Sequence, residues 1–203
     1  MAIAPTLNDT LDPRSRAILE AAFQTFCQYG YRRTSMEDIA RAAGMSRAAL
    51  YLHYKNKQDI FRSLAQLYFD GAEAGTQAAL QPGISPQQAL SGVFAAKAGP
   101  EMEGLFSSPH GEELLDVNFS VCGDIVREGE ARIASHLAHW LSAEAAAGRI
   151  APFDPDESAE ALAQTIIAAV AGQKAPQLGY PAYRAAGERL AALFGRGLMP
   201  PVR

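Results

Sequence analysis

The segment that begins at Ser35 constrains the fold most, because it fits two short helices joined by a tight turn. Ser35 is followed three residues later by a carboxylate, which is a capping-box-like start for a helix over about 36–43. Ala40 precedes Gly44 by four residues, and Leu50 follows six residues after that glycine. A small residue lets two helices cross closely, a glycine permits the positive φ of the turn, and the leucine fills the core behind the second helix. This spacing is typical of a helix-turn-helix, although an ordinary helical hairpin also fits it.

The rest of the chain also shows helical periodicity, with apolar residues recurring at spacings of three or four. Capping and stop residues predict helices over about 13–29, 36–43, 46–54, 57–80, 86–98, 100–106, 111–147, 156–173 and 181–194. Asp154 and Pro155 are the expected cap of the second-last helix, and Gly123 and Gly129 are expected kinks in the long one. No segment alternates in the manner of a strand. The prediction is an all-α protein with about nine helices.

Charge is divided unevenly along the chain. The net charge of the 203 residues is −4, yet residues 1–57 carry eight Lys and Arg against five Asp and Glu. The remaining residues carry ten basic and seventeen acidic side chains. A basic end on an acidic body suggests that only one end meets a polyanion. Together with the helical pattern, this suggests three parts: a flexible tail at 1–12, a three-helix helix-turn-helix head at 13–57, and a larger helical-bundle body at 58–203.

Two adjoining runs carry a resemblance to a known family. Residues 46–57 read SRAALYLHYKNK and lead into Asp59-Ile60-Phe61, which closely resembles the recognition helix and following junction of the TetR family. Residues 31–46, YRRTSMEDIARAAGMS, also resemble that family, and the match spans about 13–62. The resemblance implies a homodimeric transcription regulator, more often a repressor, that binds a palindromic operator in double-stranded DNA.

The same resemblance implies roles for individual residues of the head. The start of the recognition helix enters the major groove in this family. Arg47 is the only long polar side chain there, so it is the expected base reader, bonding guanine through two hydrogen bonds. Tyr51, His53 and Lys57 match positions that contact phosphates, and a helix N-terminus such as that of Lys57 also favours an anion. The full set expected to contact DNA is Thr34, Ser35, Ser46, Arg47, Ala49, Tyr51, His53 and Lys57.

Some positions of the head leave alternatives open. Tyr51 also fits a core position, and His53 also fits a solvated polar one. Leu52 departs from the family, which often has an aromatic residue there, so no phosphate contact is expected from it.

The resemblance implies that the body dimerises and binds a small-molecule effector. The sequence is compatible with the dimer interface that the resemblance implies, because apolar residues recur on faces that suit a four-helix interface, with intramolecular core as the alternative; they are Ile166, Ile167, Val170, Leu190, Leu193 and Phe194. An effector pocket is expected between the helices of 85–147. Its lining is expected to be Met102, Leu105, Phe106, Asn118, Phe119, Cys122, Ile125 and His136, each of which also fits a core position. The apolar bias of this set suggests a hydrophobic or aromatic effector.

Other classes of protein have weaker support. Cys27 and Cys122 fit neither a zinc motif nor a disulfide framework, and His136 and His139 lack a third ligand, so we expect no metal or other cofactor. No nucleophile elbow, phosphate loop or dinucleotide fingerprint is present, so we expect no enzyme. The sequence lacks a signal-like start and a long apolar run, which predicts a cytoplasmic protein with no membrane partner. The remaining alternative is a helical small-molecule-binding module that has lost DNA binding.

Overall fold

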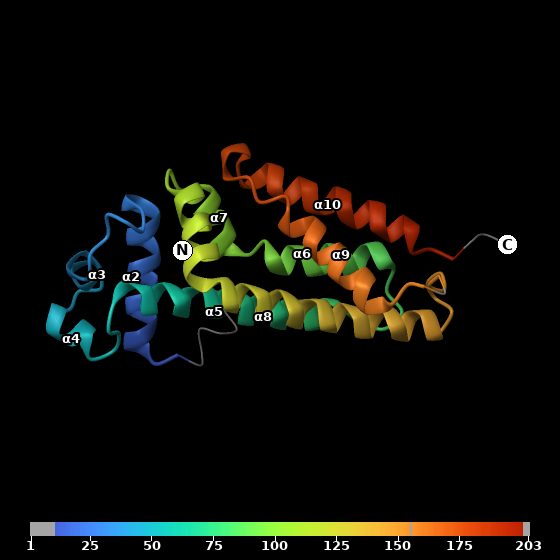
Figure 1. Cartoon of the computed structure of the whole chain (residues 1–203), viewed down its shortest axis with the longest axis horizontal. Helices are drawn as coiled ribbons and strands as arrows, with labels where there is room; N and C mark the ends of the chain where they lie inside the picture. Colours follow the sequence, from blue (N-terminus) through green and yellow to red (C-terminus); the bar gives the residue numbers. More distant parts are fainter. Residues whose placement is uncertain (1–10, 155, 201–203) are drawn as a thin grey trace. The chain divides into compact units, whose positions relative to one another are not determined.

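The computed structural model of the protein describes residues 11–154 and 156–200. Within these ranges it contains nine α-helices, one 3-10 helix and no strand (Figure 1). The elements are α2 (Pro13–Tyr29), α3 (Met36–Ala42), α4 (Arg47–Tyr51), α5 (Lys57–Ala79), α6 (Pro86–Lys97), α7 (Pro100–Phe106), α8 (Gly111–Ala146), α9 (Ala159–Ala171), η1 (Pro176–Leu178) and α10 (Tyr180–Gly197). The predicted all-α fold class is confirmed. The expected tail at 1–12 lies outside the described residues apart from Leu11 and Asp12.

The chain divides into two compact units. One unit comprises residues 1–71 and 99–127, and the other comprises residues 72–98 and 128–203. Helices α2, α3, α4 and α7 belong to the first unit, whereas α6, α9 and α10 belong to the second. The long helices α5 and α8 contribute residues to both units. None of the helices in the described ranges is both long and apolar enough to span a membrane.

The helices of the first unit begin close to where the sequence predicts, although α4 ends at Tyr51 and not near residue 54. Asp12 caps α2 by accepting hydrogen bonds from the amides of the next turn, and Gly30 ends that helix with φ of 80°. Ser35 forms the predicted capping box at the start of α3. Gly44 takes φ of 67° in the turn, and Ser46 caps α4. The sequence signals therefore set the local geometry of the helix-turn-helix.

The core of the first unit is built from the predicted apolar faces. Ile39 and Leu50 are fully buried and join α3 and α4 to the rest of the unit. Behind them the rings of Phe26, Tyr31 and Phe61 pack with centroid separations of 5.2–5.5 Å. Each buried large side chain contributes about 1.5–3 kcal/mol to folding. This packing holds α4, a helix of only five residues, which is too short to be stable alone.

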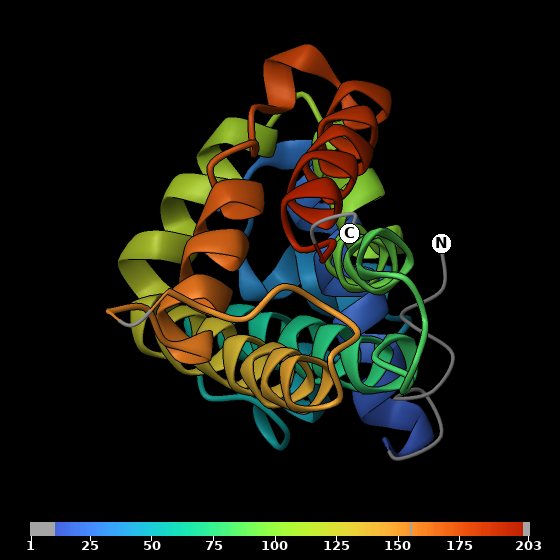
Figure 2. The same ribbon diagram turned by 90° about the vertical axis from the view of Figure 1, so that its right-hand side faces the viewer.

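In the second unit α10 packs closely along α6, as both ribbon views show (Figure 1, Figure 2). Small residues on one side of α10 permit the close approach, and Gly187, Ala191 and Gly195 are all buried there. A Cβ atom at Gly195 would lie 2.8 Å from the backbone of Gln87 on α6, which is closer than a side chain tolerates. This side of α10 is therefore occupied within the chain.

Helix α8 is interrupted at Cys122, where the backbone has φ of −120° and ψ of 19°. Arg62 accounts for the break, because its guanidinium donates to the carbonyl of Val121 at 2.7 Å and pairs with the carboxylate of Asp124 at 2.5 and 2.8 Å. A side chain that binds a helix carbonyl is a recognised cause of a kink. The predicted kink at Gly123 is off by one residue, since the sequence does not reveal the distant arginine.

Helix α9 begins later than predicted. Its N-cap is Ser158, whose side chain accepts a hydrogen bond from the amide of Ala161 at 3.1 Å. The predicted cap at Asp154 is wrong, because the backbone there is not yet helical. Pro155, the other residue of the predicted cap, lies outside the described residues.

Candidate DNA interface

Helix α4 presents one face to the core and the other to solvent. Leu50 is fully buried, whereas Tyr51 is 43% exposed and Leu52, which follows the helix, is 87% exposed. Arg47 and His53 are also exposed. The exposure of Tyr51 rules out the core alternative for this side chain. A single buried leucine thus anchors a helix whose first turn is free to approach a ligand.

The guanidinium of Arg47 is held in place by two neighbours. Its Nη2 atom donates to the hydroxyl of Tyr51 at 3.4 Å, and its central carbon lies 5.5 Å from the centre of that ring. Its Nη1 atom lies 3.9 Å from a carboxylate oxygen of Glu37 on α3. The hydrogen bond to Tyr51 raises the pKa of Arg47, so this side chain carries its charge at every physiological pH. The arginine is exposed, charged and oriented along the outer face of α4.

The two serines of the expected set serve as helix caps. Ser35 donates to a carboxylate oxygen of Asp38 at 2.6 Å and accepts from the Asp38 amide at 3.2 Å. Ser46 accepts from the amide of Ala49 at 3.1 Å. Because both serines are exposed and the cap of Ser46 uses only its acceptor capacity, the Ser46 hydroxyl proton remains available to a phosphate oxygen.

Thr34 does not lie where the sequence places it. Its side chain is 2% exposed, and its hydroxyl donates to the carbonyl of Gly30 at 2.7 Å. A buried threonine that already donates its proton cannot reach a phosphate. The expectation of a DNA contact from this side chain is therefore corrected, and Thr34 instead stabilises the loop between α2 and α3.

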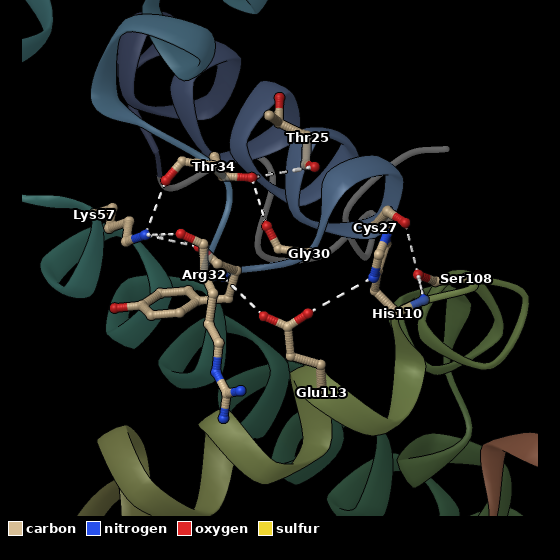
Figure 3. A network of polar contacts seen from close by, with 10 residues as sticks. Thr25, Cys27, Gly30, Arg32, Thr34, Lys57, Ser108, His110 and Glu113 are labelled. Atoms are coloured by element: carbon tan, nitrogen blue, oxygen red, sulfur yellow. Dashed lines mark hydrogen bonds and ion pairs between the residues drawn. The ribbon is translucent and has the colours of Figure 1, made fainter.

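The side chain of Lys57 also forms hydrogen bonds within the protein (Figure 3). Its ammonium donates to the carbonyls of Tyr31, Arg32 and Thr34 at 2.7, 3.1 and 2.9 Å. The same ammonium lies 4.6 Å from the centre of the Tyr31 ring. Partial burial lowers the pKa of Lys57, an effect that the Glu113 carboxylate opposes. The three donors of this ammonium are thus engaged with the protein, which leaves the helix N-terminus of α5 as the part of this residue that can meet a phosphate.

The residues expected to line an effector pocket fall in both units. The five that are buried are Met102, Leu105, Phe106, Cys122 and Ile125. Phe119 is 62% exposed and Asn118 is partly exposed. His136 belongs to the second unit, where its Nε2 atom lies 2.9 Å from a carboxylate oxygen of Glu73 and 2.9 Å from the side-chain nitrogen of Gln77. In the described ranges no three His, Cys, Asp or Glu side chains gather in a way that could hold a metal ion.

The residues expected at a dimer interface also divide into two groups. The three on α9 are 0–3% exposed in the single chain, so they are core residues and the interface expectation for them is corrected; they are Ile166, Ile167 and Val170. The three on α10 are accessible: Leu193 is 57% exposed, and Leu190 and Phe194 are partly exposed.

A buried ion pair in the second unit was not predicted. Lys97 is fully buried at the end of α6, and its ammonium bonds a carboxylate oxygen of Glu130 on α8 at 2.5 Å. Burial, and to a smaller extent the charge of Lys97, lowers the pKa of Lys174 to about 8. A lysine at a helix end is ordinarily solvated, so the sequence carries no signal for this polar cluster inside an apolar bundle.

Comparison with known proteins agrees with this geometry. Residues 18–64 match the family described as bacterial regulatory proteins, tetR family. The uncharacterised HTH-type transcriptional regulator YhgD of Bacillus subtilis is 22% identical over 157 residues, which are 77% of this chain and 82% of YhgD. The HTH-type transcriptional repressor ComR of Escherichia coli is 36% identical over 83 residues, 40% of each chain.

A solved structure shows the same fold. The crystal structure of a TetR-family regulator from a Rhodococcus species matches with a TM-score of 0.70 and 22% identity, covering 91% of this chain and 100% of that one. The sequence match covers α3 and α4 together with most of α2 and the start of α5, which is the segment whose caps, turn and exposed helix are described above. Residues 18–64 of this chain therefore match the helix-turn-helix of the tetR family of bacterial regulatory proteins, and the chain as a whole has the fold of a solved TetR-family structure.

Proposed function

We propose that this regulator is a homodimeric repressor that binds a palindromic operator and responds to a small-molecule effector. The observation that carries the proposal is the exposed first turn of α4, where Arg47 lies over the ring of Tyr51. An arginine held in this way has lost part of its side-chain freedom before binding, so less entropy is lost when it bonds a base. Reading guanine through two hydrogen bonds is the recognition that this side chain supports.

The contacts to the DNA backbone come from groups around α4. We assign them to the hydroxyls of Ser46 and Tyr51, to His53, and to the N-terminus of α5 at Lys57. Such contacts fix the position of the protein on the duplex without reading its sequence. Ser35 and Ala49 complete the set, Ser35 near the backbone and Ala49 close to a base.

Dimer formation is assigned to the exposed side of α10. Leu193 is 57% exposed, and Leu190 and Phe194 lie on the same helix with partial exposure. The opposite side of α10 is already packed on α6 by Gly187 and Gly195. Burying large apolar side chains against a second copy gives a favourable contribution of about 25 cal/mol for each Å² removed from water.

The effector is assigned to the helical body, whose apolar interior suits a hydrophobic or aromatic molecule. Effector binding and DNA binding are coupled, because the protein has a different affinity for DNA when the effector is bound. In a repressor that its effector releases from DNA, the bound effector lowers the affinity for DNA, so the coupling between the two sites is negative. A regulator of this kind acts in the cytoplasm, where bacterial DNA lies.

Selection from a random duplex library tests the proposal. The wild-type protein should enrich an inverted repeat whose half-sites are one helical turn apart, about 34–36 Å, or a multiple of it. Sedimentation of the protein with the enriched duplex should give two chains for each duplex. Enrichment of no motif by a folded protein would contradict the proposal.

One observation favours the second candidate, a ligand-binding module without DNA binding. The carboxylate of Glu37 lies 3.9 Å from Arg47 and would repel a phosphate brought near it. Both side chains are more than half exposed, so solvent screens the pair and its energy is small. The exposed Arg47 and the capped, outward-facing helix outweigh this single carboxylate, and the same selection experiment separates the two candidates.

A further inference from the structure

The loop of residues 30–34, between α2 and α3, is held from two sides. On one side the ammonium of Lys57, the first residue of α5, binds three of its carbonyls. On the other side Glu113, in the first turn of α8, accepts a hydrogen bond from the backbone amide of Arg32 at 2.8 Å. Figure 3 shows the lysine and the glutamate approaching the loop from different helices. A cation binds the carbonyls and an anion binds the amide, so each charge meets the backbone group that it favours.

The end of α2, just before this loop, is tied to the start of α8 as well. The hydroxyl of Ser108 donates to the carbonyl of Cys27 at 2.6 Å and accepts from the amide of His110 at 2.9 Å. The His110 ring nitrogen lies 3.6 Å from the second carboxylate oxygen of Glu113. The segment between α7 and α8 therefore contacts the carbonyl of Cys27 near the end of α2, and its His110 lies beside Glu113, which binds the loop that follows.

Gly30 makes the contact with Glu113 possible. A Cβ atom at this position would collide with the Glu113 carboxylate, and the backbone has φ of 80°. Both the left-handed conformation and the close approach require glycine. The loop is thus shaped to receive this carboxylate.

The two helices that bind the loop are the two that contribute residues to both compact units. Lys57 begins α5, and Glu113 lies at the start of α8. On its N-terminal side the helix-turn-helix is joined to α2 by this loop, and Lys57 and Glu113 bind the loop from the first turns of α5 and α8. A charge-assisted hydrogen bond is short and directional, which makes it suited to fixing an angle.

We propose that Glu113 is a positioning residue: together with Lys57 it fixes the angle of the helix-turn-helix and thereby the half-site spacing that the dimer accepts. This inference rests on the proposed function, because half-site spacing has meaning only for a dimer on a palindrome. The sequence of each half-site is read by α4, which Glu113 does not contact. Loss of the Glu113 contact therefore affects the spacing of half-sites and leaves their sequence unchanged.

The test measures binding to duplexes that carry the half-sites selected by wild type, separated by spacers of different length. Wild type should prefer one spacing by about tenfold or more. Glu113→Ala should bind the neighbouring spacings to within about threefold of the best one, with the same preferred bases in each half-site. Glu113→Gln retains an acceptor for the Arg32 amide and should restore the wild-type preference. Glu112→Ala removes an exposed carboxylate from the same turn and is the matched control, which should behave as wild type.

The outcomes separate this inference from the proposed function. If wild type selects no inverted repeat, the proposed function fails and this inference fails with it. If wild type selects a repeat and Glu113→Ala keeps the wild-type spacing preference, the positioning role alone is overturned. Should Glu113→Ala fail to fold, Lys57→Met provides the second variant, since it removes the other charge that binds the loop. Broadened spacing in Lys57→Met supports the inference, and an unchanged spacing profile overturns it.

Discussion

Replacement of Arg47 by alanine should abolish the preference for one base pair in each half-site, with a loss of about 5- to 150-fold in discrimination at that position. The reason is that no other long polar side chain lies at the start of α4. Arg47→Lys should recover part of the affinity and little of the discrimination, because an ammonium keeps the charge but lacks the planar pair of donors. Competition binding with duplexes changed one base pair at a time measures both effects.

Arg41→Ala is the matched control for this prediction. Arg41 is an exposed arginine on α3 that pairs only with Asp38, at 3.6 Å, among the ion pairs of the described residues. Its removal changes the net charge by the same amount as Arg47→Ala. A general electrostatic effect would weaken all duplexes alike in both variants. If Arg41→Ala and Arg47→Ala gave the same profile across base changes, Arg47 would not be the base reader.

Lys57→Met should destabilise the protein by about 2–3 kcal/mol, and it should weaken binding to duplexes of the wild-type spacing without changing the preferred bases. The methionine side chain is similar in length, but it has no donor for the three carbonyls of the α2–α3 loop. Because these carbonyls are partly buried, water can replace the lost hydrogen bonds of the ammonium only in part. Urea unfolding measures the loss of stability, and titration with the selected operator measures the loss of affinity.

Lys55→Met separates this structural role from simple loss of charge. Lys55 is exposed and lies two residues before Lys57 in the same junction. Its replacement should leave the free energy of unfolding unchanged within about 0.5 kcal/mol, as is usual for surface positions. If Lys55→Met and Lys57→Met had the same free energy of unfolding, the hydrogen bonds of Lys57 to the loop would contribute nothing to stability.

The fold of the head could be predicted from its sequence because its signals are local. The Ser35 capping box, the positive φ of Gly44 and the Ser46 cap each depend on residues within one turn. Leu50 at its fixed spacing then closes the core. The exposure of Arg47 follows from the same helical period. Such features are set by neighbours in the chain, and a single sequence contains them all.

The parts that could not be predicted depend on residues distant in sequence. Thr34 is a local exception: a threonine before a helix is usually exposed, but this side chain is 2% exposed and donates to the carbonyl of Gly30, four residues earlier. The bond between Lys57 and the loop joins residues more than twenty positions apart. For Ile166 periodicity indicates a buried face, yet it cannot tell whether the burying surface belongs to the same chain or to a second one. The predicted lining of the effector pocket has the same problem, because His136 lies in a different unit from the other residues predicted to line the pocket.

The central claim is that the head reads DNA sequence. The most direct test compares the affinity of the wild-type protein for its selected operator with its affinity for a scrambled duplex of equal length. Both affinities are measured across a salt series. We expect the wild-type protein to bind the operator at least about 10³-fold more tightly than the scrambled duplex at physiological salt. Both affinities should fall steeply as salt rises, since phosphate contacts release counterions. Equal affinity for the two duplexes at every salt concentration would contradict sequence reading by α4.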